Sequence, residues 1–262
     1  MDFSLHCGHT NAVDIAAAIH SWQPRLAVGL IVLLIAWETA QPYFVLFTGG
    51  RAGWLKRGRH ALINLAIGTV NALLTGLVFA VVWLATTAWA EQHAIGLLNW
   101  LVLPEWVGWI VAVLLLDAWT YSWHRLNHVI PFFWRFHKLH HSDREMDVTT
   151  ASRFHFVEIL FSSVLRVPVL VLVGCSIEQL ALYELLLFGV VQFHHANIGL
   201  PGSLDRALRA VIVTPALHKV HHSEVRAECD SNFSSLFSWW DRVFRTLRIS
   251  SKPKSIRFGV DA

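Results

Sequence analysis

Residues 106–141 read WVGWIVAVLLLDAWTYSWHRLNHVIPFFWRFHKLHH. The first half of this stretch, 106–123, is an apolar run long enough to cross a bilayer as a helix. It leads without a break into a block that holds five histidines. Spacings of three and four place side chains on one face of a helix. The stretch therefore predicts a membrane helix whose end carries a cluster of imidazoles.

The composition of the whole chain supports insertion into a membrane. Of its 262 residues, 55% are hydrophobic and only 15% are charged, with a mean hydropathy of +0.48. Soluble proteins carry about 25% charged residues. Thirteen tryptophans suit a belt at the two membrane interfaces. The net charge of +3 gives no reason to expect a nucleic-acid partner.

Further apolar runs predict an all-α polytopic membrane protein of about four transmembrane helices, or two hairpins, with a helical histidine-rich cap. The expected apolar segments are 26–48, 61–89, 106–123, 156–174 and 177–198. We divide the chain into an N-terminal membrane region (1–110), a metal-binding region (111–250) and a C-terminal tail (251–262).

Two of these segments contain polar interruptions. Glu38 and Pro42 interrupt segment 26–48. The charged side chain of Glu38 must face protein or the membrane interface. Arg166 and Pro168 interrupt segment 156–174, so the sequence leaves open whether it spans the bilayer or lies in the interface. The short turn 174–176 predicts that the last two segments form a hairpin.

The positive charges predict the orientation. Of 21 Lys and Arg residues, four lie in the expected basic loop 51–60, five in 124–155 and ten in 199–262. An even number of crossings brings these three regions to one side, which the positive-inside rule assigns to the cytoplasm. That side also carries every clustered histidine.

Eight histidines form three clusters, and their spacing predicts a two-metal site. The clusters are His124 and His128; His137, His140 and His141; His218, His221 and His222. Neutral imidazole is the commonest protein ligand for a transition metal. Adjacent histidines on a helix diverge by about 100°, so they suit two neighbouring ions better than one.

Residue types alone leave the metal open between copper and iron. A structural zinc site needs only four ligands, and this chain offers more. Imidazole suits both copper and iron, and unfilled coordination positions invite oxygen. The apolar setting favours iron and oxygen chemistry on a lipid C–H bond. Asp117 lies on one helical stripe with Tyr121, His124 and His128, where its carboxylate could accept a hydrogen bond from a ligand imidazole.

The motifs resemble those of the fatty acid hydroxylase superfamily, also called the sterol desaturase family. The resemblance covers about 115–246. It rests on D-x-x-x-Y-x-x-H-R-x-x-H at 117–128, W-R-F-H-x-x-H-H-S at 134–142, T-x-x-x-R-x-H-x-x-E at 149–158, F-x-H-x-N at 193–197, T-P-x-x-H-x-x-H-H-S at 214–223, and Asp230, Asn232 and Trp240-Asp241-Arg242. Arg245, Phe156 and Asp147 depart from the family pattern, where Gly, Pro and Asn are usual.

The resemblance implies a membrane di-iron enzyme that uses O₂ and two external electrons to hydroxylate or desaturate a lipid. It implies these metal ligands: His124, His128, His137, His140, His141, His195, His218, His221 and His222, with His155 as a further ligand or a supporting residue. His194 falls at a position that varies in the family pattern, so the resemblance does not imply that it is a ligand. Asp117, Asn197, Glu158 and Asp241 become candidates for catalytic or supporting roles beside the ligands.

The implied partners are a lipid substrate, the bilayer, and an external electron donor such as a ferredoxin, a cytochrome or a reductase. The alternative is a non-catalytic or hydrolytic membrane metal-binding protein. A zinc protease would carry H-E-x-x-H, which the sequence lacks. A transport site usually lies near the middle of the membrane, whereas these histidines gather at one edge.

Overall fold

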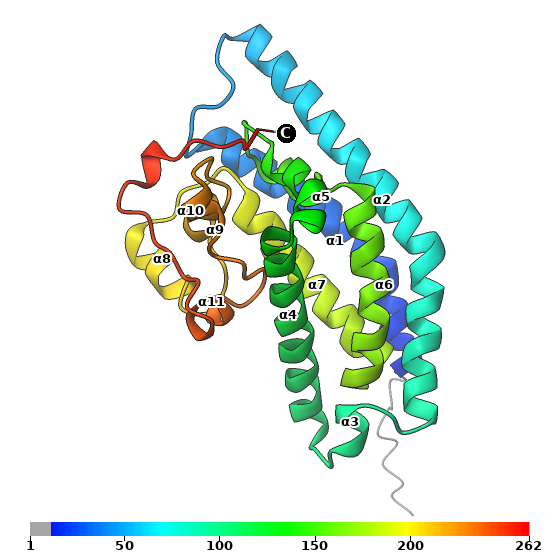
Figure 1. Cartoon of the computed structure of the whole chain (residues 1–262). Coiled ribbons are helices and arrows are strands. Elements are labelled where there is room, and N and C mark those ends of the chain that lie inside the picture. Colours follow the sequence, from blue (N-terminus) through cyan, green and yellow to red (C-terminus); the bar gives the residue numbers. More distant parts are fainter. Residues whose placement is uncertain (1–11, 262) are drawn as a thin grey trace, which may run out of the picture.

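A computed structural model describes residues 12–261 of the chain, with side chains from residue 25 onward, and within that range it contains helices but no strand. About 70% of the chain is helical, which confirms the all-α prediction. The long helices are α1 (Ala12–Ala40), α2 (Arg51–Gln92), α4 (Glu105–Val129), α6 (Phe156–Val173) and α7 (Ile177–His195). Figure 1 shows them as an elongated bundle.

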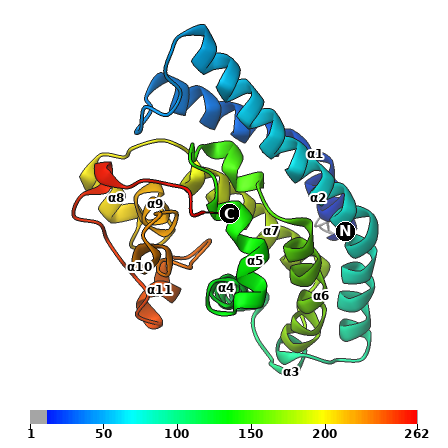
Figure 2. The same ribbon diagram turned by 45° about the horizontal axis from the view of Figure 1, so that its top comes forward.

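Shorter elements complete the fold. Between the long helices lie α3 (Leu97–Trp100), α5 (Pro131–His141) and the 3₁₀ turn η1 (Val148–Ser152). After α7 the chain forms a cap of α8 (Gly202–Leu208), α9 (Pro215–His221), α10 (Arg226–Cys229), α11 (Trp239–Val243) and the 3₁₀ turn η2 (Pro253–Ser255). In both views the cap lies beside α4, on the side away from α2 and α6 (Figures 1 and 2).

Three helical stretches in the described part of the chain are long and apolar enough to cross a membrane: Arg51–Trp100, Glu105–Val129 and Phe156–Val173. The third is the segment whose span the sequence left open. Side chains on α2 such as Leu62, Leu77 and Val81 are 69%, 77% and 68% exposed, as expected for groups that face lipid. These helices mark the chain as a membrane protein.

The basic segment 51–60 was predicted to be a loop, and that prediction is wrong. Arg51–His60 form the first turns of α2. The real break lies just before it, where Gly49 and Gly50 adopt positive φ angles of 96° and 58°. The preceding helix also ends earlier than the expected segment 26–48, at Ala40, because Pro42 disfavours a helical conformation in the residue before it.

The turn between α6 and α7 forms as expected, but the two helices do not make a simple paired hairpin. Gly174 ends α6 in the left-handed conformation, with φ 67°, and Ser176 caps α7 in a capping box with Gln179. Beyond the turn, α6 packs mainly against α2, whereas α7 packs against α1 and α4. The contacts that each helix makes with other helices, and not the turn between the two, therefore determine where it packs.

The bundle brings five helix ends together at one end of the molecule. The last turns of α1, α4 and α7 and the first turns of α2 and α6 lie at this end with α5 and the cap, and the start of α2 projects furthest, while α3 lies at the opposite end (Figure 1). Asp117 fastens the cap to α4, since its Oδ2 accepts hydrogen bonds from Trp240 Nε1 at 2.8 Å and from the Phe237 amide at 3.0 Å.

Candidate metal centre

Nine of the ten predicted ligand histidines converge at the capped end in two groups. The five-histidine cluster comprises His124, His128, His137, His141 and His221, and the four-histidine cluster comprises His140, His195, His218 and His222. Within each cluster the candidate ligand atoms lie within 4.8 Å of one another. Apart from the partly buried His124, each of these residues is at most 3% exposed. Helices α4, α5, α7 and α9 supply all of them except His222, which directly follows α9.

The four-histidine cluster points its Nε2 atoms at a common centre. The Nε2 of His195 lies 3.1 Å from that of His140 and 3.0 Å from that of His218, which in turn lies 3.1 Å from that of His222. A chain of three such contacts is poorly explained by hydrogen bonding alone, because a neutral imidazole has a single N–H. Metal–imidazole bonds of about 2.0–2.1 Å bring ligand nitrogens to comparable separations.

The five-histidine cluster has its outer nitrogens held by the protein. The Nδ1 of His124 and the Nδ1 of His221 each lie 2.7 Å from a backbone carbonyl, those of Phe233 and Ser231 respectively. His137 Nδ1 lies 2.8 Å from Glu158 Oε1. Such contacts fix the ring and leave Nε2 free to bind a metal.

One short segment orients most of this cluster. We call Cys229–Phe233 the orienting strap. Besides its two carbonyls, it places Asp230 Oδ1 3.2 Å from His128 Nδ1 and Cys229 Sγ 3.6 Å from His141 Nδ1. Four of the five rings therefore take their orientation from one stretch of cap, and only His137 relies on an acid from α6.

Asp241 and Asn232 hold the strap in place. Asp241 accepts hydrogen bonds from the amides of Phe233 and Ser234 at 2.8 and 3.1 Å. Asn232 has a positive φ of 53°, and its Nδ2 donates to the carbonyls of Leu217 and Arg248. Asp241 thus acts on His124 through the Phe233 carbonyl and does not contact the imidazole itself.

The described residues fit metal ions at both positions. The Nε2 atoms of His128 and His221 are buried and have no hydrogen-bond partner among them. A buried polar atom without a partner is costly, and a bound ion would satisfy both nitrogens. His141 of one cluster stacks on His222 of the other, with ring centroids 4.4 Å apart, so the two positions are neighbours.

Burial keeps these histidines neutral, which is the form that binds metal. Removal from water, together with the surrounding imidazoles, holds the pKa of His140, His218 and His222 well below the ordinary value. Burial lowers the pKa of His221 to about 3. At neutral pH these rings are therefore uncharged.

The tenth predicted ligand, His155, lies outside both clusters. Its Nδ1 accepts a hydrogen bond from the Val157 amide at 3.2 Å and caps α6, and its ring stacks on Phe156. His194 is buried with its ring centroid 3.9 Å from that of His218, but it also belongs to neither cluster.

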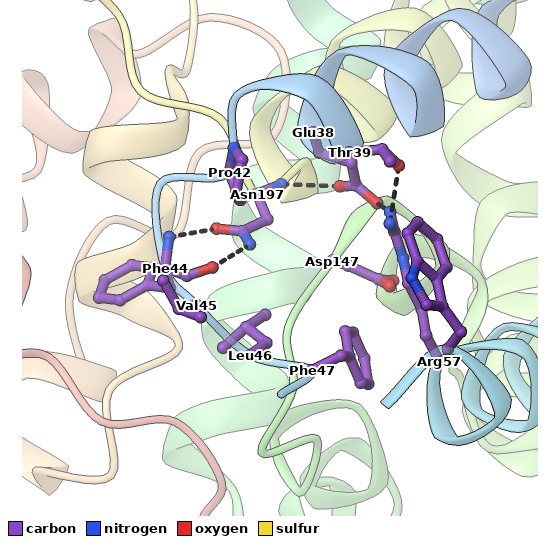
Figure 3. Close-up of a pocket in the computed structure, with 11 residues that line it drawn as sticks. Glu38, Thr39, Pro42, Phe44, Val45, Leu46, Phe47, Arg57, Asp147 and Asn197 are labelled. Carbon is purple, nitrogen blue, oxygen red and sulfur yellow. Dashed lines mark hydrogen bonds and ion pairs between the residues drawn. The ribbon is translucent and has the colours of Figure 1, made fainter. Parts of the chain in front are cut away.

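Two predicted supporting residues act away from the imidazoles. Asp117 ties the cap to α4, as described above. Asn197 clamps the segment after α1, since its Oδ1 accepts from the Phe44 amide at 2.9 Å and its Nδ2 donates to the Phe44 carbonyl at 2.8 Å. Figure 3 shows both contacts in a cleft of about 130 Å³, beside the ion pair of Glu38 with Arg57. Among the described residues, no histidine lines this cleft.

The backbone carbonyls of Ser231 and Phe233 are functional groups that sequence reasoning missed. A carbonyl is present at every residue, so nothing in the sequence singles these two out. The side chain of Asp230 was noticed only as part of a motif, without a role.

Comparisons with known proteins agree on one family. The profile described as fatty acid hydroxylase matches residues 109–246. The chain is 30% identical over 152 residues to an ornithine lipid hydroxylase of Rhizobium tropici, covering 58% of this chain and 45% of the relative. It is 26% identical over 226 residues to human alkylglycerol monooxygenase, covering 82% and 48%.

A mouse cholesterol 25-hydroxylase is 28% identical over 152 residues, covering 56% of this chain and 49% of the relative. The chain thus spans about half the length of the curated relatives it matches. No solved structure matches it.

Proposed function

Because this chain belongs to the fatty acid hydroxylase family, we propose that it is a membrane-bound oxygenase that inserts oxygen into a lipid C–H bond. The observation that carries the proposal is the convergence of nine histidines into two adjacent clusters. Their nitrogens would hold two iron ions, which supply the redox chemistry with O₂ and two electrons from outside the chain.

The protein's own residues prepare the site. The strap carbonyls and Glu158 keep Nδ1 protonated on His124, His221 and His137, so that Nε2 presents its lone pair. Burial excludes water from eight of the nine ligands. The stacked pair His141 and His222 keeps the two positions adjacent.

A lipid substrate is supported by the printed names of the relatives, which act on an ornithine lipid, an alkylglycerol and cholesterol. All three names describe a hydroxylase or a monooxygenase, and this favours hydroxylation over desaturation. Phe154 offers an apolar contact beside the four-histidine cluster. The partly exposed ring of Phe154 stacks on His140, with centroids 4.2 Å apart.

We place the metal centre at the cytoplasmic face of a multi-pass protein. The end of the bundle that holds the histidines also holds the cap and the starts of α2 and α6. The three basic regions, 51–60, 124–155 and 199–262, therefore lie at this end. The positive-inside rule assigns such an end to the cytoplasm. The lipid tail would then enter from the bilayer, with its head group near that face.

The test combines metal analysis with lipid chemistry. Protein purified from iron-supplied cells should contain iron, and it should take up O₂ when given reductant and a lipid extract. Lipids of cells that express the chain should gain a species heavier by one oxygen atom. Bound zinc without O₂ uptake would support a hydrolytic or non-catalytic metal-binding protein instead.

A further inference from the structure

We propose that Trp134 is the point where electrons enter the five-histidine cluster, and that the cationic surface around it docks an acidic one-electron carrier protein. The proposal rests on the proposed function, because hydroxylation with O₂ consumes two electrons that the described residues do not supply. It assigns a site of entry and the chemistry of the partner.

The inner face of Trp134 lies against the ligands. Its ring centroid is 5.0 Å from that of His128, 5.6 Å from that of His141 and 6.2 Å from that of His137. One indole thus contacts three of the five rings. Among the ring contacts of the described residues, no other tryptophan touches a ligand histidine.

The outer face of Trp134 reaches the surface through a cation. The guanidinium of Arg226 lies 4.2 Å from the indole centroid, in cation–π geometry. Arg226 is 48% exposed, and it is fixed by hydrogen bonds to the His128 carbonyl at 2.9 Å and to Asp230 Oδ2 at 2.6 Å. The half-buried indole therefore connects the ligand rings to a cation that solvent can reach.

The two sides of α5 differ in character. Phe132 and Phe136 contact Phe161 of α6 and form an apolar side. Trp134 and the half-buried Lys138 lie one helical turn apart on the other side. Exposed Arg135 lies between the two sides, with its guanidinium 5.7 Å from the Phe136 ring centroid. A water-soluble carrier would meet the cationic side, since the apolar side suits lipid.

Charge complementarity selects an acidic partner. The Arg226 guanidinium lies over the indole, and Arg135 and Lys138 flank Trp134 along α5, whereas the nearby Asp230 is already paired with Arg226. Opposite charges accelerate encounter and align the partners. Electron-transfer complexes bury little surface, so a patch of this size is sufficient. Two successive transfers per turnover each oxidise a carrier by one electron and reduce the metal centre by one electron, leaving Trp134 unchanged.

The experiment compares two reductants on the iron-loaded, membrane-inserted enzyme without oxygen. A reduced plant-type [2Fe–2S] ferredoxin serves as the acidic carrier, and dithionite serves as a small reductant. Trp134→Leu should slow reduction by ferredoxin by roughly tenfold or more, and reduction by dithionite should not change. The matched control is Trp239→Leu, since Trp239 is 38% exposed on the cap and stacks on Phe237 away from the histidines.

Binding gives a readout that does not depend on turnover. The double variant Arg135→Glu/Lys138→Glu should weaken ferredoxin binding about tenfold and flatten its salt dependence. It also tests the proposal if Trp134→Leu does not fold. The iron content and the spectrum of the oxidised centre should match the wild type in every variant.

Either of two results would overturn this inference and leave the proposed function intact. In the first, ferredoxin reduces Trp134→Leu at the wild-type rate. In the second, reduction by ferredoxin and reduction by dithionite are slowed equally, and the spectrum is altered. The second result would mean that Trp134 only holds the ligand rings in position. A wild-type enzyme that takes up no O₂ even with dithionite and lipid would instead remove the proposed function, and the inference with it.

Discussion

His141 and His222 stack face to face, with ring centroids 4.4 Å apart and planes inclined by 17°, although they belong to different histidine clusters. His141 ends α5 and His222 follows α9, so the contact joins the bundle to the cap. The stacked pair forms the wall between the two metal positions. Each position nevertheless has its own set of nitrogens, and the two can be tested separately.

Replacement of His222 by Ala should remove one of the two metal ions. The four-histidine cluster would keep three ligands, whereas the five-histidine cluster would keep all of its own. Metal analysis by mass spectrometry should find the iron content reduced toward half, and O₂ uptake should be lost. His93→Ala is the control, because His93 is exposed at the far end of α2. Full iron retention in His222→Ala would contradict the assignment.

Replacement of Glu158 by Gln should weaken metal binding without unfolding the protein. Glu158 accepts from His137 Nδ1 at 2.8 Å, and a neutral amide orients and polarises the ring less well. Loss of such a partner typically costs about 10–100-fold in metal affinity. Competition with a chelator measures the change. Glu184→Gln is the matched control, since Glu184 pairs with Arg166 and contacts no ligand. Equal affinity in both variants would rule out this role for Glu158.

The metal-free protein should lose stability as the pH falls below about 6.5, the ordinary pKa of histidine in an unfolded chain. Burial lowers the pKa of His221 to about 3, and those of His140, His218 and His222 also fall. The unfolded state therefore binds more protons, and stability is lost across the window between these pKa values. Thermal unfolding in detergent should show a lower midpoint at about pH 5 than at about pH 7, with little change above that. A midpoint that does not respond to acid would contradict the burial of these rings.

Replacement of Gly174 by Ala should destabilise the junction between α6 and α7. Gly174 has φ 67°, and an added Cβ would lie 2.8 Å from Asn99 Nδ2 and 2.9 Å from the Ile95 carbonyl. The left-handed conformation alone costs an L-residue about 1–2 kcal/mol. Thermal unfolding should show a lower midpoint. Gly76→Ala is the control, because nothing lies within 4 Å of its added Cβ in α2, and there the midpoint should hold or rise. A similar response in the two variants would argue against strain at Gly174.

The nine converging histidines could be predicted because helical spacing groups the members of each sequence motif, and because the family resemblance marked His195. His137, His140 and His141 lie on one helix, and each cluster in the chain supplies ligands to the same end. His155 shares the motif but not the site, because its Nδ1 caps α6. A capping role depends on where a helix begins, which the spacing of histidines does not report.

The supporting contacts could not be predicted, because they join residues far apart in the chain. Asp117 was expected to accept a hydrogen bond from a ligand imidazole, but Phe237 and Trp240 of the cap donate to it instead. The strap orients rings through backbone carbonyls, which leave no trace in the sequence. Likewise, the charges of 51–60 suggested a loop, although Gly49 and Gly50 place the break before them.

The most direct test of the central claim is X-ray absorption at the iron edge of the purified wild-type protein, combined with its metal content. The account predicts two iron ions per chain, each surrounded by nitrogen-rich ligands at about 2.1 Å, a typical metal–imidazole distance. It also predicts that an iron neighbour is seen from each ion. A single ion per chain, or iron bound mainly by sulfur, would contradict it.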